Sequence, residues 1–236
     1  MSYKKRLDGR RVDELRPMEA KASVIPNADG SAFFKIGKTT AYAAVYGPRE
    51  LFPKFLQDPQ KGLLRCHYGM MPFSGSVERI RPGNNRRSQE ISLVMTKALE
   101  PMLDLSAFPN AVVDIFVDLP QTDAGTRCAA ISAAAIALAD AGIPMKDMVS
   151  SVAVGQVAGT VVADLMYDEE AYEGIVSDIP VAMTHNTKEI TLLQMDGEIS
   201  KEDLVQALEL ARSATEKVYE VQKQALKEKF KGVPEA

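Results

Sequence analysis

Two short segments place arginine where a helix is expected to begin. Gly125, Thr126 and Arg127 precede an alanine-rich stretch, and Arg86 and Arg87 precede a second stretch with helical spacing. An arginine in the first turn opposes the positive end of the helix dipole, and a bound anion relieves that opposition. The first segment can surround one phosphate with backbone amides, a hydroxyl and a guanidinium, whereas the paired arginines can clamp a phosphodiester. Two such sites suit a reaction between two phosphate groups.

Each segment also has a purely structural interpretation. Asp123 can cap the alanine-rich helix and pair with Arg127, and adjacent surface arginines are commonly solvated. The chain contains no Gly-x-x-x-x-Gly-Lys-Ser/Thr sequence. Nucleotide hydrolysis of the P-loop kind is therefore disfavoured.

Carboxylates gather between residues 164 and 178, just before the apolar run 179–183. Asp178 stands where a loop is expected to enter a strand, so its side chain can be held rigidly. It is a candidate general acid or ligand of a divalent cation. The other carboxylates are expected to form a solvated loop.

Composition limits the kind of protein that must position these residues. The 236 residues are 46% hydrophobic and 25% charged, which is typical of a globular chain. The net charge of −4 excludes a polycation that coats nucleic acid indiscriminately, so any anion must be bound locally. We expect a single domain over residues 1–230 and a frayed tail over residues 231–236.

The sequence gives little support for a membrane protein, a disulfide-stabilised protein or a structural zinc site. No run approaches the roughly 20 apolar residues of a membrane helix, and the N-terminus lacks a signal-peptide core, so we expect a cytoplasmic protein without a membrane partner. Cys66 and Cys128, with His67 and His185, are too few for a disulfide framework or a structural zinc site. Two unpaired thiols are expected.

The periodicity predicts strands, a helix, a strand, a helix, strands and a long last helix, which is an α+β fold with mixed pairing. The predicted strands are residues 20–26, 31–46, 111–119, two around a turn in 152–165, and 189–195. The predicted helices are residues 88–99, capped by Asn84 or Asn85, a second after residue 127 that closes at Gly142, and a third of about 28 residues from Ser200.

Seven segments occur in an order that resembles the RNase PH family: residues 8–17, 37–48, 86–92, 121–127, 140–144, 177–182 and 192–197. The resemblance spans residues 6–230 and is closest to the catalytic RNase PH-like subunit of the archaeal exosome. It implies a duplicated β-α unit with mixed sheets, assembled in hexameric rings.

The resemblance also implies an activity. It is 3′-to-5′ degradation of single-stranded RNA with inorganic phosphate as co-substrate, releasing nucleoside 5′-diphosphates, with RNA tailing as the reverse reaction. We therefore expect the protein to be a nuclease and, in the broad classification, a hydrolase. By this resemblance, Gly125, Thr126 and Arg127 bind phosphate. Arg86 and Arg87 bind the RNA backbone, and Asp178 is the acid that protonates the departing 3′ oxygen.

One position departs from the family pattern. Relatives place a second carboxylate six residues before the position of Asp178, where this chain has Tyr172. A short insertion accounts for the difference and leaves Glu170 or Asp168 as the second carboxylate. Asp178 and Glu170 are then candidate Mg²⁺ ligands.

A more distant segment lines the RNA path in exosome-like relatives. Here it contains Lys61, Arg65, His67 and Tyr68. The cations can follow the RNA backbone, and Tyr68 either stacks on a base or is an ordinary strand aromatic.

The implied partners are single-stranded RNA, a paralogous non-catalytic RNase PH-like subunit in a hexameric ring, and RNA-binding cap subunits. The alternatives are a homohexameric RNase PH that trims tRNA 3′ ends and a catalytically silent ring subunit that binds RNA. Segments 47–53 and 192–197 favour the exosome type, and the presence of Arg127 and Asp178 argues against the silent one.

Overall fold

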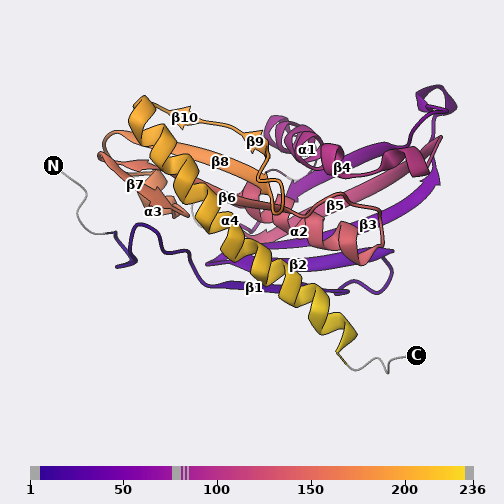
Figure 1. The fold of residues 1–236 in the computed structure, drawn as a ribbon, viewed down its shortest axis with the longest axis horizontal. Coiled ribbons are helices and arrows are strands. Elements are labelled where there is room, and N and C mark those ends of the chain that lie inside the picture. Colours follow the sequence, from indigo (N-terminus) through magenta and orange to yellow (C-terminus); the bar gives the residue numbers. More distant parts are fainter. Residues whose placement is uncertain (1–5, 76–80, 82, 84, 232–236) are drawn as a thin grey trace.

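The described residues form two five-stranded sheets that share a buried helix and are both crossed by a long one (Figure 1). The computed structural model describes residues 6–75, 81, 83 and 85–231. The first sheet has the order β1-β2-β3-β5-β4, with bounds Met18–Ala22, Gly30–Ile36, Thr39–Glu50, Ala111–Gln121 and Leu63–Met70. Its pairs are antiparallel except for β4 and β5, which run parallel, so the predicted mixed pairing is confirmed.

The second sheet is antiparallel and is built around β8. Its order is β10-β8-β6-β7, and β9 also pairs with β8. The bounds are Val149–Val157 for β6, Thr160–Ala163 for β7, Val176–Thr184 for β8, Ile190–Leu193 for β9 and Asp196–Gly197 for β10. Each half of the chain therefore supplies one sheet, as a duplicated β-α unit requires.

The helices differ in how deeply they lie. They are α1 (Arg86–Leu99), α2 (Thr126–Asp140), α3 (Tyr167–Glu170) and α4 (Lys201–Phe230). Helix α2 contacts β2 and β3 of the first sheet and β6 of the second, and nearly all of its residues are buried. Its alanines allow both sheets to approach the helix axis closely. Helix α1 packs on β4 instead.

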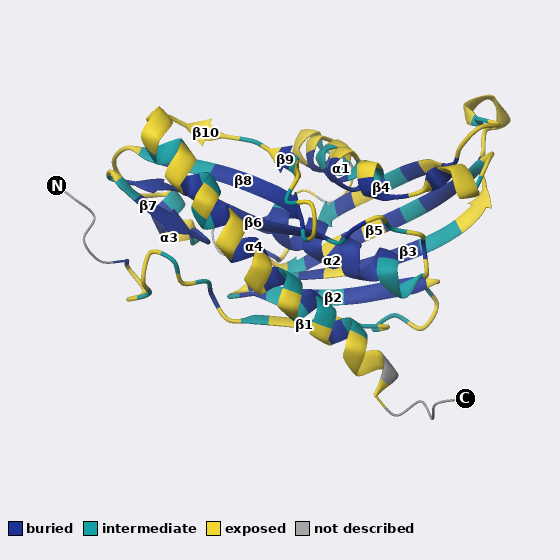
Figure 2. Ribbon diagram, viewed as in Figure 1, coloured by how far each residue is buried: buried dark blue, intermediate teal, exposed yellow. Residues whose placement is uncertain are grey.

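Helix α4 crosses β1 of the first sheet and β6 and β7 of the second, and only its inner stripe is buried (Figure 2). The buried stripe repeats at the helical spacing of three and four residues: Ala207, Ala211, Ala214, Val218 and Ala225. Ser200 caps the helix by accepting a hydrogen bond from the Asp203 amide at 3.1 Å. The predicted long last helix is confirmed.

The structure adds β4 and α3, which the sequence pattern did not predict. Helix α1 begins at Arg86, two residues before its predicted start, because Asn85 caps it; Asn84 lies outside the described residues. Of the predicted tail, residues 232–236 also lie outside them, and so do residues 1–5 of the predicted domain. The single domain over residues 1–230 stays a prediction.

Candidate functional site

A pocket of about 510 Å³ lies at the start of α2. It collects side chains from α1, from the segment joining β5 to α2, and from α3, β8 and β10. Its lining consists of Arg87, Asp123, Ala124, Gly125, Thr126, Arg127, Tyr167, Glu170, Ala171, Val176, Asp178, Pro180, Asp196 and Gly197. The pocket therefore brings the predicted phosphate segment together with Asp178 and one of the α1 arginines.

The N-terminus of α2 has no side-chain cap among the described residues. Gly125 precedes the helix with a φ of 68°, a left-handed conformation that favours glycine. Asp123, the alternative cap, instead receives hydrogen bonds from Arg16 Nη1 and the Tyr167 amide, each at 3.2 Å. The interpretation of Asp123 as cap and partner of Arg127 is therefore wrong, and the first amides of α2 border the pocket without a side-chain acceptor.

Arg127 extends from the first turn of α2 along the pocket wall. Its side chain is 22% exposed, and its Nη1 donates to Gln194 Oε1 and, at 3.5 Å, to Glu90 Oε1. These two partners come from the segment between β9 and β10 and from α1. The guanidinium is thus held at the junction of three elements.

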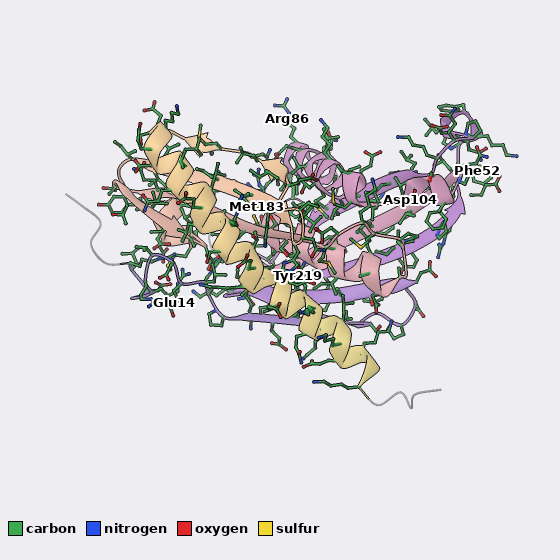
Figure 3. All side chains as sticks on the ribbon, viewed as in Figure 1. Glu14, Phe52, Arg86, Asp104, Met183 and Tyr219 are labelled. Carbon is green, nitrogen blue, oxygen red and sulfur yellow. The ribbon has the colours of Figure 1, made fainter. Side chains whose placement is uncertain are left out.

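The two α1 arginines are separated by the geometry of the helix. Asn85 and Ser88 cap α1 reciprocally, with the Ser88 amide donating to Asn85 Oδ1 at 2.8 Å and the Asn85 amide to Ser88 Oγ at 2.9 Å. Adjacent helical residues point about 100° apart. Arg87 lines the pocket, whereas exposed Arg86 projects outward from α1 (Figure 3).

Asp178 is the third residue of β8, slightly inside the strand rather than at the predicted junction. Burial raises the pKa of Asp178 to about 6, although Arg127 lowers it and Asp196, its partner on β10, raises it. Its Oδ1 is buried and makes no hydrogen bond within the described residues. Such a carboxyl keeps a proton at a higher pH than an exposed one.

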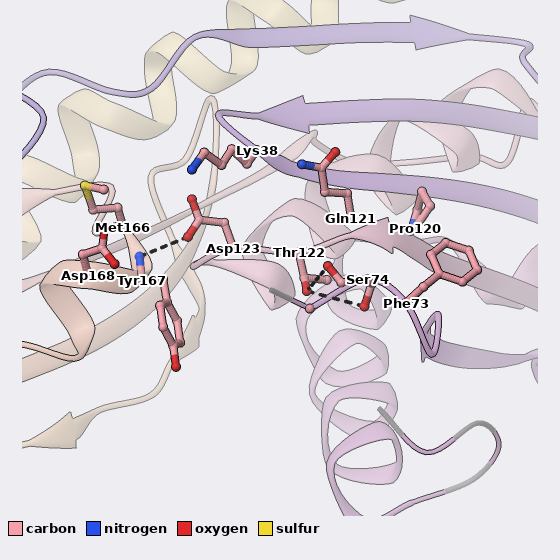
Figure 4. A pocket seen from close by; sticks show the side chains of 11 residues that line it. Lys38, Phe73, Ser74, Pro120, Gln121, Thr122, Asp123, Met166, Tyr167 and Asp168 are labelled. Atoms are coloured by element: carbon pink, nitrogen blue, oxygen red, sulfur yellow. Dashed lines mark hydrogen bonds between the residues drawn. The ribbon is translucent and has the colours of Figure 1, made fainter. Parts of the chain in front are cut away.

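Glu170, at the end of α3, also lines this pocket, as do Asp123 and Asp196. Burial, followed by the charge of Asp178, raises the pKa of Glu170 to about 7. Asp168 is exposed and lines a neighbouring pocket of about 430 Å³ with Lys38 and Phe73 (Figure 4). Of the two sequence candidates, the structure places Glu170 beside Asp178, and its chemical role stays a prediction.

The acidic segment before Asp178 is fastened by buried ion pairs. Arg6 donates to both carboxylate oxygens of Glu169 at 2.9 and 2.7 Å, and Arg16 donates to those of Asp164 at 2.9 and 2.7 Å. Glu169 is 0% exposed and Asp164 is 1% exposed. The expectation of a solvated loop is wrong for these two residues, because arginines far away in the sequence neutralise them. The pairing fixes the segment that carries Glu170.

A metal would find few ligands here. Within the described part of the chain, no group of three or more His, Cys, Asp or Glu side chains is arranged to hold a metal ion. Mg²⁺, however, is commonly bound by one or two carboxylates together with substrate phosphates. The unpaired Oδ1 of Asp178 beside Glu170 fits that pattern, and Mg²⁺ binding stays a prediction.

Cys66 and Cys128 are unpaired, as predicted, and burial raises the pKa of each thiol to about 12.

The cationic residues around β4 lie outside this pocket. Arg65 donates to both carboxylate oxygens of Asp114 at 2.6 and 2.9 Å, and the ring of His67 stacks on Phe116 at 4.6 Å. Lys61, before the strand, lies 3.6 Å from a Glu100 oxygen. Arg65 and His67 share the outer face of β4 because strand residues alternate.

Tyr68 points to the opposite face of β4. The residue is only 6% exposed and belongs to the hydrophobic core of the first sheet. Its burial favours the ordinary strand aromatic, although Tyr68 also lines a pocket of about 420 Å³ beside α1, and stacking on a base stays a prediction.

Three residues of the site architecture were missed: Arg16, Glu90 and Gln194. Arg16 supports Asp123 and Asp164, while Glu90 and Gln194 hold Arg127. The contacts of Arg16 and the contact between Arg127 and Gln194 join residues at least 67 positions apart, Arg127 and Glu90 are 37 apart, and no local pattern marks these pairs. All three residues carried one signal, because each lies in a segment that resembles the RNase PH family: Arg16 in 8–17, Glu90 in 86–92 and Gln194 in 192–197.

Comparison with known families gives two matches in tandem. Residues 14–144 match the 3′ exoribonuclease family, domain 1, and residues 147–214 match domain 2 of the same family. The boundary between them falls just before β6, where the first sheet ends and the second begins.

Similar proteins cover almost the whole chain. Exosome complex component Rrp41 of Thermococcus kodakarensis is 50% identical over 226 residues, 96% of this chain and 90% of that protein. Exosome complex component Rrp41 of Methanopyrus kandleri is 50% identical over 227 residues, 96% of this chain and 94% of that protein.

Solved structures share the fold. Rice Rrp46 superimposes with a TM-score of 0.82 at 24% identity, covering 94% of this chain and all 100% of that one. A chain of the Archaeoglobus fulgidus exosome with RNA bound to the active site gives a TM-score of 0.78 at 22% identity, covering 92% of each. The predicted α+β fold is confirmed. In the described residues, no helix is both long and apolar enough to span a membrane.

Proposed function

Because the chain belongs to the RNase PH family of 3′ exoribonucleases, we propose that it shortens single-stranded RNA from the 3′ end by phosphorolysis. The product is a nucleoside 5′-diphosphate. One observation carries the proposal: the uncapped start of α2 and Arg127 share a pocket with Asp178, a carboxyl whose pKa is raised to about 6. An anion site thus lies beside a proton donor.

The first step is the binding of inorganic phosphate. Gly125, Thr126 and Arg127, which form the start of α2, all line the pocket and carry backbone amides, a hydroxyl and a guanidinium. They offer donors and positive potential to an anion the size of phosphate. Gly125 lets the backbone begin the helix without a side chain between the phosphate and these donors.

The RNA backbone occupies the other side of the pocket. Arg87 lines this side, and Arg86 lies next to it on the exposed surface of α1. Their charges offset the repulsion between phosphate and the phosphodiester, and the fixed helix termini require little reorganisation.

The chemical step exchanges a phosphodiester bond of the RNA for the phosphoanhydride bond of the nucleoside diphosphate. An oxygen of the bound phosphate attacks the scissile phosphorus, and the bond to the 3′ oxygen of the preceding nucleotide breaks. Asp178 donates its proton to that departing oxygen, which contributes about 10² to 10⁴ in rate. Reversal of the same steps extends RNA from nucleoside diphosphates. Because phosphate and not water is the acceptor, the broad class of hydrolase is inaccurate.

A protonated Glu170 adds no negative charge beside Asp178, and burial together with the charge of Asp178 raises the pKa of Glu170 so that it keeps its proton to about pH 7. If Mg²⁺ participates, Asp178 and Glu170 hold it, and it supplies positive charge to the phosphate oxygens.

The assembly belongs to the same proposal. Relatives that are 50% identical are named exosome complex components, and we extend that to this chain. Its partners are then single-stranded RNA, a paralogous RNase PH-like subunit in a hexameric ring, and RNA-binding cap subunits. A mass measurement of the chain alone and co-expressed with such subunits separates this assembly from a homohexameric RNase PH.

The decisive experiment is a phosphate titration on unstructured RNA with the assembled complex. Nucleoside diphosphates should appear only when phosphate is present, and excess diphosphates should lengthen the RNA. Nucleoside monophosphates formed without phosphate would refute phosphorolysis, and a complex that binds RNA without releasing product would indicate the silent ring subunit.

A further inference from the structure

Arg127 is held by a network that the proposed reaction does not use directly. Its Nη1 donates to Gln194 Oε1 and to Glu90 Oε1 at 3.5 Å, and Gln194 Nε2 donates to the same Glu90 oxygen at 3.1 Å. The three side chains therefore form a closed triangle of hydrogen bonds between α2, α1 and the segment between β9 and β10.

Only an amide suits the corner that Gln194 occupies. A glutamine accepts at Oε1 and donates at Nε2, so it can face a guanidinium and a carboxylate at once. The opposite orientation would place two donors together and two acceptors together. Glutamate lacks the donor that meets Glu90, and a lysine or arginine lacks the acceptor that meets Arg127.

The backbone around Gln194 is anchored on both sides. Leu193 pairs with Val181 of β8, Asp196 pairs with Asp178, and the Gln194 amide itself donates to the Pro180 carbonyl at 3.2 Å. The side chain therefore projects from a fixed point beside β8, the strand that carries Asp178.

The network uses only one of the three guanidinium nitrogens. Within the described residues, Nε and Nη2 of Arg127 make no hydrogen bond, so they stay available to a ligand in the pocket. Glu90 alone would draw the guanidinium toward α1 and compete with a bound anion. Gln194 gives Nη1 of Arg127 a neutral acceptor, and its own Nε2 donates to the same Glu90 oxygen that Nη1 contacts.

We infer that Gln194 is a positioning residue that orients Arg127 toward phosphate and, with Glu90, sets the affinity of the enzyme for phosphate. The inference rests on the proposed phosphorolysis. It adds that the phosphate site depends on a contact between the RNA-facing helix α1 and the strand segment that carries Gln194.

The test is Gln194→Ala in the assembled complex, with phosphate and RNA titrated separately. The KM for phosphate should rise about 3- to 10-fold, the effect of losing one or two ordinary hydrogen bonds. The kcat at saturating phosphate and the KM for RNA should stay within about twofold, because Gln194 touches no reacting atom. Gln224→Ala is the matched control: it also breaks a glutamine–glutamate hydrogen bond, at 2.9 Å to Glu228, but on the exposed face of α4.

An exchange of charges gives an independent check. Gln194→Glu places two carboxylates together and should raise the KM for phosphate more than Gln194→Ala does. Adding Glu90→Gln removes that repulsion and restores a donor–acceptor pair, so the KM should fall at least about threefold from that of the single variant.

The outcomes separate this inference from the proposal beneath it. A phosphate-dependent wild type whose KM for phosphate is unchanged by Gln194→Ala overturns the inference. An equal loss of kcat and RNA affinity also overturns it, since the residue would then act only on folding. A wild type that releases no diphosphate overturns the proposed function instead.

Discussion

The two helices that carry arginine in their first turn, α1 and α2, begin in opposite ways. At the start of α1, Asn85 and Ser88 satisfy each other's amides, and the arginines that follow are exposed. At the start of α2, Gly125 leaves the first amides without a side-chain cap, and the helix is buried between two sheets.

This difference decides what each helix start can bind. A capped terminus has little left to offer an anion except its long side chains, which suits an extended chain of phosphates at the surface. An uncapped terminus in a pocket can surround one small anion with fixed donors. In the function we propose, the same residue type, arginine, therefore binds RNA at α1 and phosphate at α2.

The largest effect is expected at the α2 pocket, from Asp178→Asn. The change is nearly isosteric but removes the acidic proton, so turnover should fall about 100-fold or more while RNA binding persists. Single-turnover assays of the assembled complex measure both. Asp168→Asn, in the exposed neighbouring pocket, is the control and should retain wild-type turnover. Unchanged turnover in Asp178→Asn would exclude this residue as the acid.

Burial of Glu170 in the pocket should also make the stability of the folded protein depend on pH. The pKa of Glu170 is raised from 4.5 to about 7, so its ionisation is disfavoured in the folded state. The folded protein therefore loses stability as pH rises from about 4.5 through 7, by about 3 kcal/mol once the group is ionised. Glu170→Gln removes this loss.

Thermal unfolding at several pH values measures the difference between Glu170→Gln and the wild type. The variant should be the more stable at pH 8, and the advantage should shrink as pH falls through this window. An advantage that is the same at pH 8 and pH 5 would contradict a buried, ionising Glu170.

At α1 the expected effect is smaller and depends on salt. Changing Arg86 and Arg87 together to Glu should weaken RNA binding about tenfold at moderate ionic strength and flatten the salt dependence, which has a slope near −0.7 per contacted phosphate for single strands. The KM for phosphate should change less than the KM for RNA. If the salt slope is unchanged, α1 does not contact the RNA backbone.

The smallest effects compare the two helix starts directly. Asn85→Ala removes the cap of α1, and Gly125→Ala forces alanine into a φ of 68°; each should cost about 1 kcal/mol of stability. An added Cβ at Gly125 meets only ordinary contacts, the nearest at 3.6 Å from Arg16 Nη2. Only Gly125→Ala should raise the KM for phosphate. If both variants change the KM for phosphate equally, the two helix starts do not differ in phosphate binding.

Local patterns predicted much of this arrangement. The alternation over residues 111–119 identified β5, the three-and-four spacing identified α4, and the arginines marked both helix starts. These signals are local because one face of each element is buried.

The parts that escaped prediction depend on distant partners or on mixed side chains. In β4 buried Leu64, Cys66 and Tyr68 alternate with Arg65 and His67, but the alternation covers only five residues and exposed Leu63 precedes it. The choice between Asp168 and Glu170 depends on the one turn of α3, which a sequence pattern of four residues does not define.

The ion pairs that fasten the acidic segment have a consequence for how the protein is made. Arg6 and Glu169 are 163 positions apart, and Arg16 and Asp164 are 148 apart. A growing chain that already contains α1 and α2 has not yet synthesised the carboxylates that neutralise its first arginines. Burying those arginines without their carboxylate partners is costly, so Arg6 and Arg16 can be buried only after the second half of the chain has been synthesised. The wall that carries Glu170 therefore closes late, and a ribosome-bound first half has no finished pocket in which to start degrading RNA.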